Sequence, residues 1–163
     1  MNPGRPRILI SISQQRLTLL QEQHALQHYP ISTAANGTGQ QQNSGCTPLG
    51  RHRIRAMIGG ECPLNSVFVG RRPTGEIYSP ELAKRYPERD WILSRILWLC
   101  GCEPGFNRLG SVDSMRRYIY IHGTPDTEPM GIPRSHGCIR MRNQDLVALY
   151  EQLTPGTEVL IKA

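Results

Sequence analysis

Short segments in which apolar and polar residues alternate recur along this chain, and they constrain its fold more than any other feature. Such alternation is typical of strands that bury one face. Residues 8–13 and 16–20 alternate in this way and are separated only by Gln14-Gln15, so we predict a hairpin there. Further strands are predicted over residues 26–33, 51–58, 66–70, 115–121 and 157–162.

Two other segments complete the predicted fold. Residues 91–99 fit a strand as well as a helix. Residues 143–153 predict a helix that Thr154-Pro155-Gly156 ends, with one apolar face formed by Leu146, Leu149, Tyr150 and Leu153. Many strands and one late helix predict a mainly β protein, organised as a β-sandwich. Because 163 residues can enclose a hydrophobic core, we expect residues 1–163 to form a single domain.

The charge of the chain bears on its partners. The formal net charge is +6, and Lys84 and Lys162 are the only lysines among the basic residues. A basic surface can attract nucleic acid, but the sequence has no nucleic-acid motif and no basic stripe interleaved with aromatic residues. A small substrate with several carboxylates would explain the charge equally well. No stretch approaches the ~20 apolar residues of a membrane helix, so we expect neither nucleic acid nor a membrane as partner.

The N-terminal residues and the cysteines favour a cytoplasmic location. Residues 1–7 lead directly into a short apolar run without a small-residue cleavage site, which predicts a first strand rather than a signal peptide. An odd number of cysteines without disulfide-framework spacing fits reduced thiols; they are Cys46, Cys62, Cys100, Cys102 and Cys138. Cys100-Gly101-Cys102 is too closely spaced for a Cys-x-x-Cys zinc or redox motif, and we predict no metal site and no cofactor.

One short motif points to covalent catalysis. Cys138 follows Ser135-His136-Gly137, and His122 ends the alternating run that precedes it. A cysteine in a core segment is often only a small apolar residue. A thiol with neighbouring imidazoles, however, can act as a nucleophile because a base can remove its proton. Cys138, His122 and His136 are therefore the candidate catalytic residues.

The same residues resemble the signature of a known family. Ser135-His136-Gly137-Cys138-Ile139-Arg140, preceded by Ile121-His122-Gly123-Thr124, is similar to the motif of the L,D-transpeptidase catalytic domain, the YkuD-type domain. The resemblance continues upstream in family order through residues 9–17, 29–33 and 47–54, and residues 71–115 resemble the family least. It implies the β-sandwich of that domain, with one late helix.

The resemblance also implies roles for the motif residues. Cys138 would be the nucleophile, and His122 would be the general base, oriented by the carbonyl of Gly123. The amides of Gly137 and Cys138 would face the developing oxyanion, Ser135 would hold the turn, and His136 would act structurally and electrostatically. Sequence alone leaves open which imidazole takes the proton.

Arg140 is the candidate substrate-binding residue. It lies two positions after Cys138, so the two side chains would face the same way if a strand begins there. Its guanidinium could then bind a substrate carboxylate through two hydrogen bonds. The alternative is that Arg140 is one more surface arginine in an arginine-rich chain.

Members of the resembled family attack peptidoglycan stem peptides between a diamino acid at position three and D-Ala at position four. Water as acceptor gives L,D-carboxypeptidase activity, and an amine gives a cross-link. The expected cytoplasmic location favours a carboxypeptidase that trims tetrapeptides or muropeptides during cell-wall recycling, as in the small leaderless members. The alternatives are a cross-linking L,D-transpeptidase and a non-catalytic module in which Cys138 and the two histidines bind metal.

Overall fold

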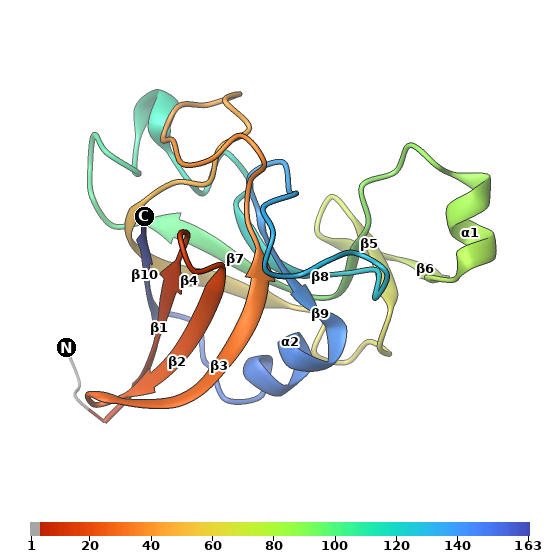
Figure 1. Ribbon diagram of the computed structural model, residues 1–163, viewed down its shortest axis with the longest axis horizontal. Helices are drawn as coiled ribbons and strands as arrows, with labels where there is room; N and C mark the ends of the chain where they lie inside the picture. Colours follow the sequence, from red (N-terminus) through yellow and green to blue (C-terminus); the bar gives the residue numbers. More distant parts are fainter. Residues whose placement is uncertain (1–3) are drawn as a thin grey trace.

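The computed structural model describes residues 4–163, which form ten strands, two α-helices and one 3-10 helix (Figure 1). The predicted mainly β fold is confirmed. The strands are β1 (Pro6–Ser11), β2 (Arg16–Gln21), β3 (His24–Ser32), β4 (Gly50–Ile58), β5 (Ser66–Val69), β6 (Arg72–Ile77), β7 (Ile92–Gly101), β8 (Tyr120–Thr124), β9 (Ile139–Arg142) and β10 (Glu158–Lys162). The helices are α1 (Pro80–Arg85), the 3-10 helix η1 (Gly110–Val112) and α2 (Asn143–Tyr150).

The sheet folds over on itself and encloses the core. Its strand order is β4-β10-β1-β2-β3-β9-β8-β7-β5-β6, and β4 also pairs with β7. Because β4 joins both β10 and β7, eight of these strands close into a ring whose two sides face each other. β5 and β6 continue the sheet beyond β7, outside the ring.

The first hairpin forms as predicted from the alternating residues. Ile8 lies opposite Leu19 and Ile10 lies opposite Leu17 in the antiparallel β1–β2 pair, and all four side chains are buried. β10 pairs with β1 in parallel on its other side. This register places every second residue of the hairpin in the core, because neighbouring side chains of a strand point to opposite faces.

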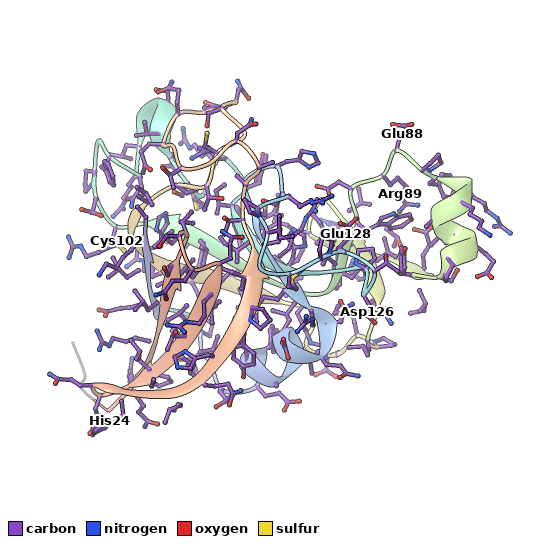
Figure 2. The ribbon with its side chains drawn as sticks, in the orientation of Figure 1. His24, Glu88, Arg89, Cys102, Asp126 and Glu128 are labelled. Atoms are coloured by element: carbon purple, nitrogen blue, oxygen red, sulfur yellow. The ribbon has the colours of Figure 1, made fainter. Side chains whose placement is uncertain are left out.

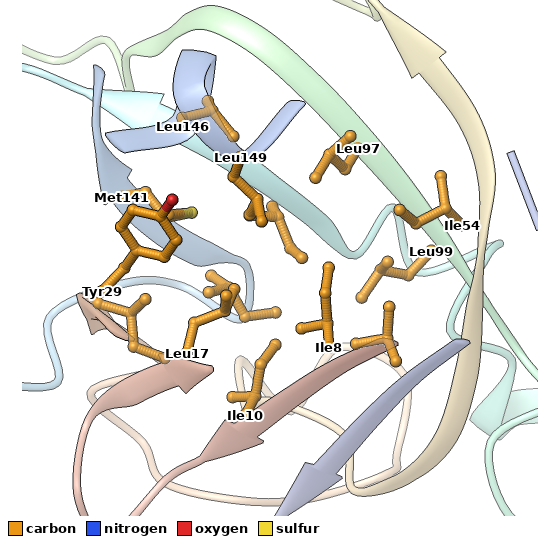
Figure 3. Close-up of a cluster of buried hydrophobic side chains, with 14 of the residues drawn as sticks. Ile8, Ile10, Leu17, Tyr29, Ile54, Leu97, Leu99, Met141, Leu146 and Leu149 are labelled. Atoms are coloured by element: carbon orange, nitrogen blue, oxygen red, sulfur yellow. The ribbon is translucent and has the colours of Figure 1, made fainter. Parts of the chain in front are cut away.

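Helix α2 covers the core between the two sides of the ring. Leu146 and Leu149 are fully buried and belong to the same cluster as Leu97, Leu99 and Ile54 (Figure 3). The predicted apolar face of this helix is confirmed, although the helix ends at Tyr150 and Leu153 packs from the turn that follows. No helix within residues 4–163 is long and apolar enough to cross a membrane.

The strand predicted over residues 115–121 is wrong for residues 115–119. The chain turns after Asp113, whose carboxylate accepts the amide of Arg116 at 3.0 Å and whose carbonyl accepts the amide of Arg117 at 2.9 Å. Tyr118 has a φ of 57°, which lies outside the extended region of regular strand backbone. β8 therefore begins only at Tyr120. Asp113 competes successfully with the sheet for these amides.

Residues 66–90 form an arm that projects from the ring and contains β5, β6 and α1 (Figure 1). Neither β6 nor α1 was predicted. α1 begins where Ser79 Oγ accepts the amide of Leu82 at 3.1 Å and Pro80 occupies the first helical position, a common helix start. The ambiguous segment 91–99 is part of β7, where Leu93 packs with Val67 of the arm.

Candidate active site

The predicted base lies on β8, and the predicted nucleophile immediately precedes β9, the neighbouring parallel strand. β8 and β9 pair so that Ile121 lies opposite Ile139 and His122 lies opposite Arg140. Both isoleucines are buried in the main core. Alternate residues therefore face the other way, and that side of the pair carries His122 and Arg140, with Cys138 immediately before β9. The expectation that Cys138 leads into a strand is confirmed.

His122 is held as a neutral base. Its Nδ1–H donates to the carbonyl of Gly123 at 2.7 Å, and only 1% of the residue is exposed. Because a carbonyl only accepts, the second ring nitrogen, Nε2, carries the free lone pair. Burial is the main effect on the ring and lowers the pKa of His122, partly opposed by the Gly123 hydrogen bond. The ring is thus ready to take up a proton at neutral pH.

The backbone beside His122 is packed too tightly for any side chain. A Cβ atom at Gly123 would meet Asn143 Oδ1 and would lie 2.6 Å from the carbonyl oxygen of Leu93. Asn143 also donates from Nδ2 to the carbonyl of Thr124 at 2.8 Å and accepts from Ser94 Oγ at 2.7 Å. Ser94 and Asn143 could not be predicted from the sequence, because their contacts join segments far apart in the chain.

The thiol of Cys138 is protonated in its resting environment. Sγ donates to the carbonyl of Tyr118 and accepts from the amide of Tyr120, both at 3.3 Å. Burial raises the pKa of the Cys138 thiol to about 11, and the amide of Tyr120 opposes that change. Within residues 4–163, Sγ makes no hydrogen bond to His122. The arrangement is therefore a neutral thiol near a neutral base, so that attack requires proton transfer.

Ser135 stabilises the turn that carries Cys138, the predicted nucleophile. Its hydroxyl donates to the carbonyl of Cys138 at 2.5 Å and accepts from the amide of Gly137 at 3.2 Å. Gly137 adopts a φ of 136°, in a region that favours glycine, and a Cβ there would lie 3.3 Å from the carbonyl of Cys46. In this structure the amide of Gly137 donates to Ser135 Oγ. That the amides of Gly137 and Cys138 face the oxyanion stays a prediction.

Residues far upstream anchor this turn. The amide of Ser135 donates to the carbonyl of Thr33 at 2.9 Å, and Thr47 Oγ1 donates to the carbonyl of Gly137 at 2.9 Å. Arg117 donates from Nη2 to the carbonyl of Cys46 at 2.7 Å, which holds the same loop from the other side. The polar loop that begins at residue 34 is thus the support of the catalytic turn.

His136 stands between two clefts. Its side chain is 78% exposed. A cleft of about 400 Å³ on one side is lined by basic and aromatic residues that include Arg116, Arg117 and Tyr118. A cleft of about 250 Å³ on the other side is lined by charged residues that include Asp90 and Arg140. A larger cavity of about 640 Å³ lies between residues 4–7 and 152–158 and contains no predicted site residue.

Arg140 faces the smaller cleft and is paired with acidic groups. Its Nη2 lies 3.2 Å from Asp90 Oδ1, and its Nη1 lies 3.9 Å from Glu128 Oε2. Its side chain is only 9% exposed. The alternative of a solvated surface arginine is therefore wrong, whereas the substrate-binding role stays a prediction.

We expect Arg140→Lys to lower kcat/KM for a stem tetrapeptide by the equivalent of roughly 1–3 kcal/mol. Lysine keeps the charge but loses the planar pair of donors that matches a carboxylate. Steady-state kinetics would check this, with Arg55→Lys on the exposed side of β4 as the matched control. Equal kcat/KM for wild type and Arg140→Lys would remove Arg140 from the binding site.

The two shifted pKa values predict the pH dependence. Because burial lowers the pKa of His122 below 6.5, the ring stays unprotonated as the pH falls, and the acid limb of kcat/KM should lie below that value. Because the pKa of the Cys138 thiol is raised to about 11, its alkylation by iodoacetamide should rise about tenfold per pH unit up to that value. Mass analysis of the peptide 135–140 measures this rate. A rate that levels off near pH 7 would show a preformed thiolate instead.

Within residues 4–163, no group of three or more His, Cys, Asp or Glu side chains lies close enough together to hold a metal ion.

Comparisons with known proteins gave matches in sequence and in fold. The sequence model of the YkuD family, described as the L,D-transpeptidase catalytic domain, matches residues 5–161. The chain is 44% identical over 43 residues to the probable L,D-transpeptidase YbiS of Escherichia coli K12, covering 26% of this chain and 14% of YbiS. It is 47% identical over 45 residues to the putative L,D-transpeptidase YqjB of Bacillus subtilis 168, covering 28% of this chain and 26% of YqjB.

The fold is also similar to that of solved L,D-transpeptidases. L,D-transpeptidase 3 from Mycobacterium tuberculosis, solved with a faropenem-derived adduct, superimposes with a TM-score of 0.58 at 15% identity. The match covers 97% of this chain and 61% of that chain. All three matches thus span less than two thirds of the relative's length. At this identity the structural likeness shows the fold alone, and it agrees with the fold expected from the sequence motifs.

Proposed function

Because this chain belongs to the L,D-transpeptidase catalytic domain family, as the match over residues 5–161 shows, we propose that it is an L,D-carboxypeptidase. Its substrate is a peptidoglycan-derived tetrapeptide, free or as a muropeptide, from which it removes the terminal D-Ala. The observation that supports the proposal is the pairing of β8 with β9, in which His122, a buried neutral imidazole, lies opposite Arg140, two residues after the protonated thiol of Cys138.

The chemistry follows from the protonation states of the two groups. Cys138 Sγ attacks the carbonyl between the position-three residue and D-Ala while Nε2 of His122 accepts the thiol proton. The amide of Cys138 donates to the oxyanion. His122 returns the proton to the nitrogen of the departing D-Ala, which leaves a thioester. Water then attacks the thioester with His122 as base, and the tripeptide and the free thiol are released.

The exposure of the catalytic turn supports water as the acceptor. His136 is 78% exposed and borders both clefts, so solvent has access to the turn next to Cys138. Two arginines of the clefts, Arg116 and Arg140, suit a small peptide that carries several carboxylates.

The thiols support a cytosolic role in cell-wall recycling. The single S–H proton of Cys46 is within reach of the main-chain carbonyls of Asn36 and Ser44, at 3.6 and 3.7 Å from Sγ, and Cys100 accepts from Nε of Arg53 at 3.4 Å. These contacts use reduced side chains, which a cytosol maintains. Soluble peptide fragments are the form in which such a compartment would present the substrate.

A cross-linking L,D-transpeptidase is the second candidate. One observation favours it: the smaller cleft is also lined by the carboxylates of Glu88, Asp90 and Glu128, which suit an acceptor ammonium group. Glu88 and Glu128 are labelled in Figure 2. The two functions share the thioester and differ only in what attacks it.

Incubation of the pure protein with a tetrapeptide, with and without an amine acceptor, distinguishes the two functions by the masses of the products. We expect free D-Ala and tripeptide in both cases, with little dimer, and no product from Cys138→Ala. Predominant cross-linked dimer would overturn the carboxypeptidase in favour of the transpeptidase.

A further inference from the structure

Asp90 joins the arm to the catalytic turn. It is the last residue of the arm, and its two carboxylate oxygens contact two different elements of the site. Oδ1 lies 3.2 Å from Nη2 of Arg140 on β9, and Oδ2 lies 3.5 Å from Nδ1 of His136. The Asp90 side chain thus links His136 and Arg140, which lie two positions before and two positions after Cys138.

The burial of the two partners is unequal. The side chain of Arg140 is 9% exposed, whereas that of Asp90 is 48% exposed. A nearly buried guanidinium without a counter-ion is costly, because it has lost most of its hydration. A half-exposed carboxylate, in contrast, gives up an ion pair to water at little cost. The pair therefore has one member that needs a partner and one that can leave.

Two other charged residues of this cleft, Arg89 and Glu128, are less suited to form an ion pair that a substrate could displace. Arg89 is held by the Glu76 carboxylate through two hydrogen bonds, at 2.8 and 3.2 Å, and stacks on Trp91 at 4.4 Å. Glu128 lies 3.9 Å from Arg140, at the limit for an ion pair. Arg140 and Asp90 are left as the cation and the anion that face each other most closely.

We propose that Asp90 is a resident counter-ion for Arg140, which occupies the guanidinium until a substrate carboxylate displaces it. Asp90 is a positioning residue: it fills the anion site of the resting enzyme, keeps the buried charge neutralised and ties the arm to the catalytic turn. When substrate displaces Asp90, the arm loses this ion pair with the turn. The incoming carboxylate then binds Arg140, which lies two residues after Cys138. The inference rests on the proposed function only in taking the displacing group to be a peptide carboxylate.

Two small reagents test the anion site without a peptide. Iodoacetate and iodoacetamide alkylate the same thiol, but only iodoacetate carries a carboxylate that can compete for Arg140. The ratio of their rates at Cys138 therefore reports the anion site, while changes in general thiol reactivity cancel. In Asp90→Asn we expect this ratio to rise about two- to fivefold, the change that an ion pair of ordinary strength would produce.

The controls separate this role from a general effect of charge. Glu81→Gln removes the same charge from the exposed first turn of α1 on the same arm and should leave the ratio unchanged. Adding Arg140→Gln to Asp90→Asn should abolish the gain. An unchanged or lower ratio in Asp90→Asn, or an equal rise in Glu81→Gln, would overturn the proposal.

The tetrapeptide assay is a separate part of the experiment. With Asp90→Asn we expect KM for the tetrapeptide to fall about two- to fivefold, since the substrate no longer competes with a resident carboxylate. If the wild type does not cleave the peptide but the reagent ratio still rises, the proposed function fails and the counter-ion role stands. A rise in KM would overturn displacement by substrate.

Discussion

Replacement of Cys138 by alanine is expected to abolish turnover while the protein stays folded. In the proposed mechanism this thiol forms the thioester, and no other cysteine leads into the β8–β9 pair. Its loss removes a small side chain that packs at the edge of the cluster of Phe68, Ile96 and Tyr120, so the melting temperature should change by only a few degrees. D-Ala release and thermal unfolding measure the two effects.

Cys62→Ala is the matched control for this variant. Cys62 packs against the same cluster as Cys138 but lies outside the catalytic turn. It should keep nearly full activity with a similar melting temperature. Retention of more than a few per cent of activity by Cys138→Ala would mean that another group is the nucleophile.

Replacement of His122 should lower kcat by on the order of 10²-fold or more, the usual cost of a lost general base. Because the ring is buried, His122→Ala would also leave a cavity and an unpaired Gly123 carbonyl. His122→Gln is the better variant, since its amide can still donate to that carbonyl but cannot accept the thiol proton at neutral pH. Single-turnover measurement of thioester formation would isolate the affected step.

His136→Ala provides the contrast within the same site. His136 is exposed and contacts Asp90, so its loss should disturb the turn and the anion site rather than remove the base. We expect a smaller fall in kcat than for His122→Gln. Nearly normal turnover in His122→Gln together with an inactive His136→Ala would show that His136 is the base.

Much of this site could be predicted because its chemistry is local in the chain. Cys138 and the two histidines lie within one motif, and the alternating run before His122 predicts a rigid strand end. The same local signals identified the first hairpin and helix α2, since both depend on the spacing of apolar residues. The turn after Asp113 could not be predicted from the alternating pattern, because the Asp113 carboxylate accepts a backbone amide that a strand would use for pairing.

The supports of the site were decided by contacts between distant segments. Ser94 and Asn143 are 49 residues apart in the sequence, and Thr47 and Gly137 are 90 residues apart. No local pattern relates the members of either pair. The same holds for the arm. Asp90 forms an ion pair with Arg140 only because β7, which follows the arm, pairs with β8, and β8 pairs with β9.

Local residue patterns thus determined the strand-rich fold, and they identified the candidate nucleophile and the candidate base. Only the tertiary structure decided that Ser135 takes the hydrogen bond of the Gly137 amide, and that Arg140 is buried against a carboxylate of the arm. The physical reason is that periodicity and motif chemistry act over a few residues, whereas burial and charge pairing depend on which segments the closed sheet brings together.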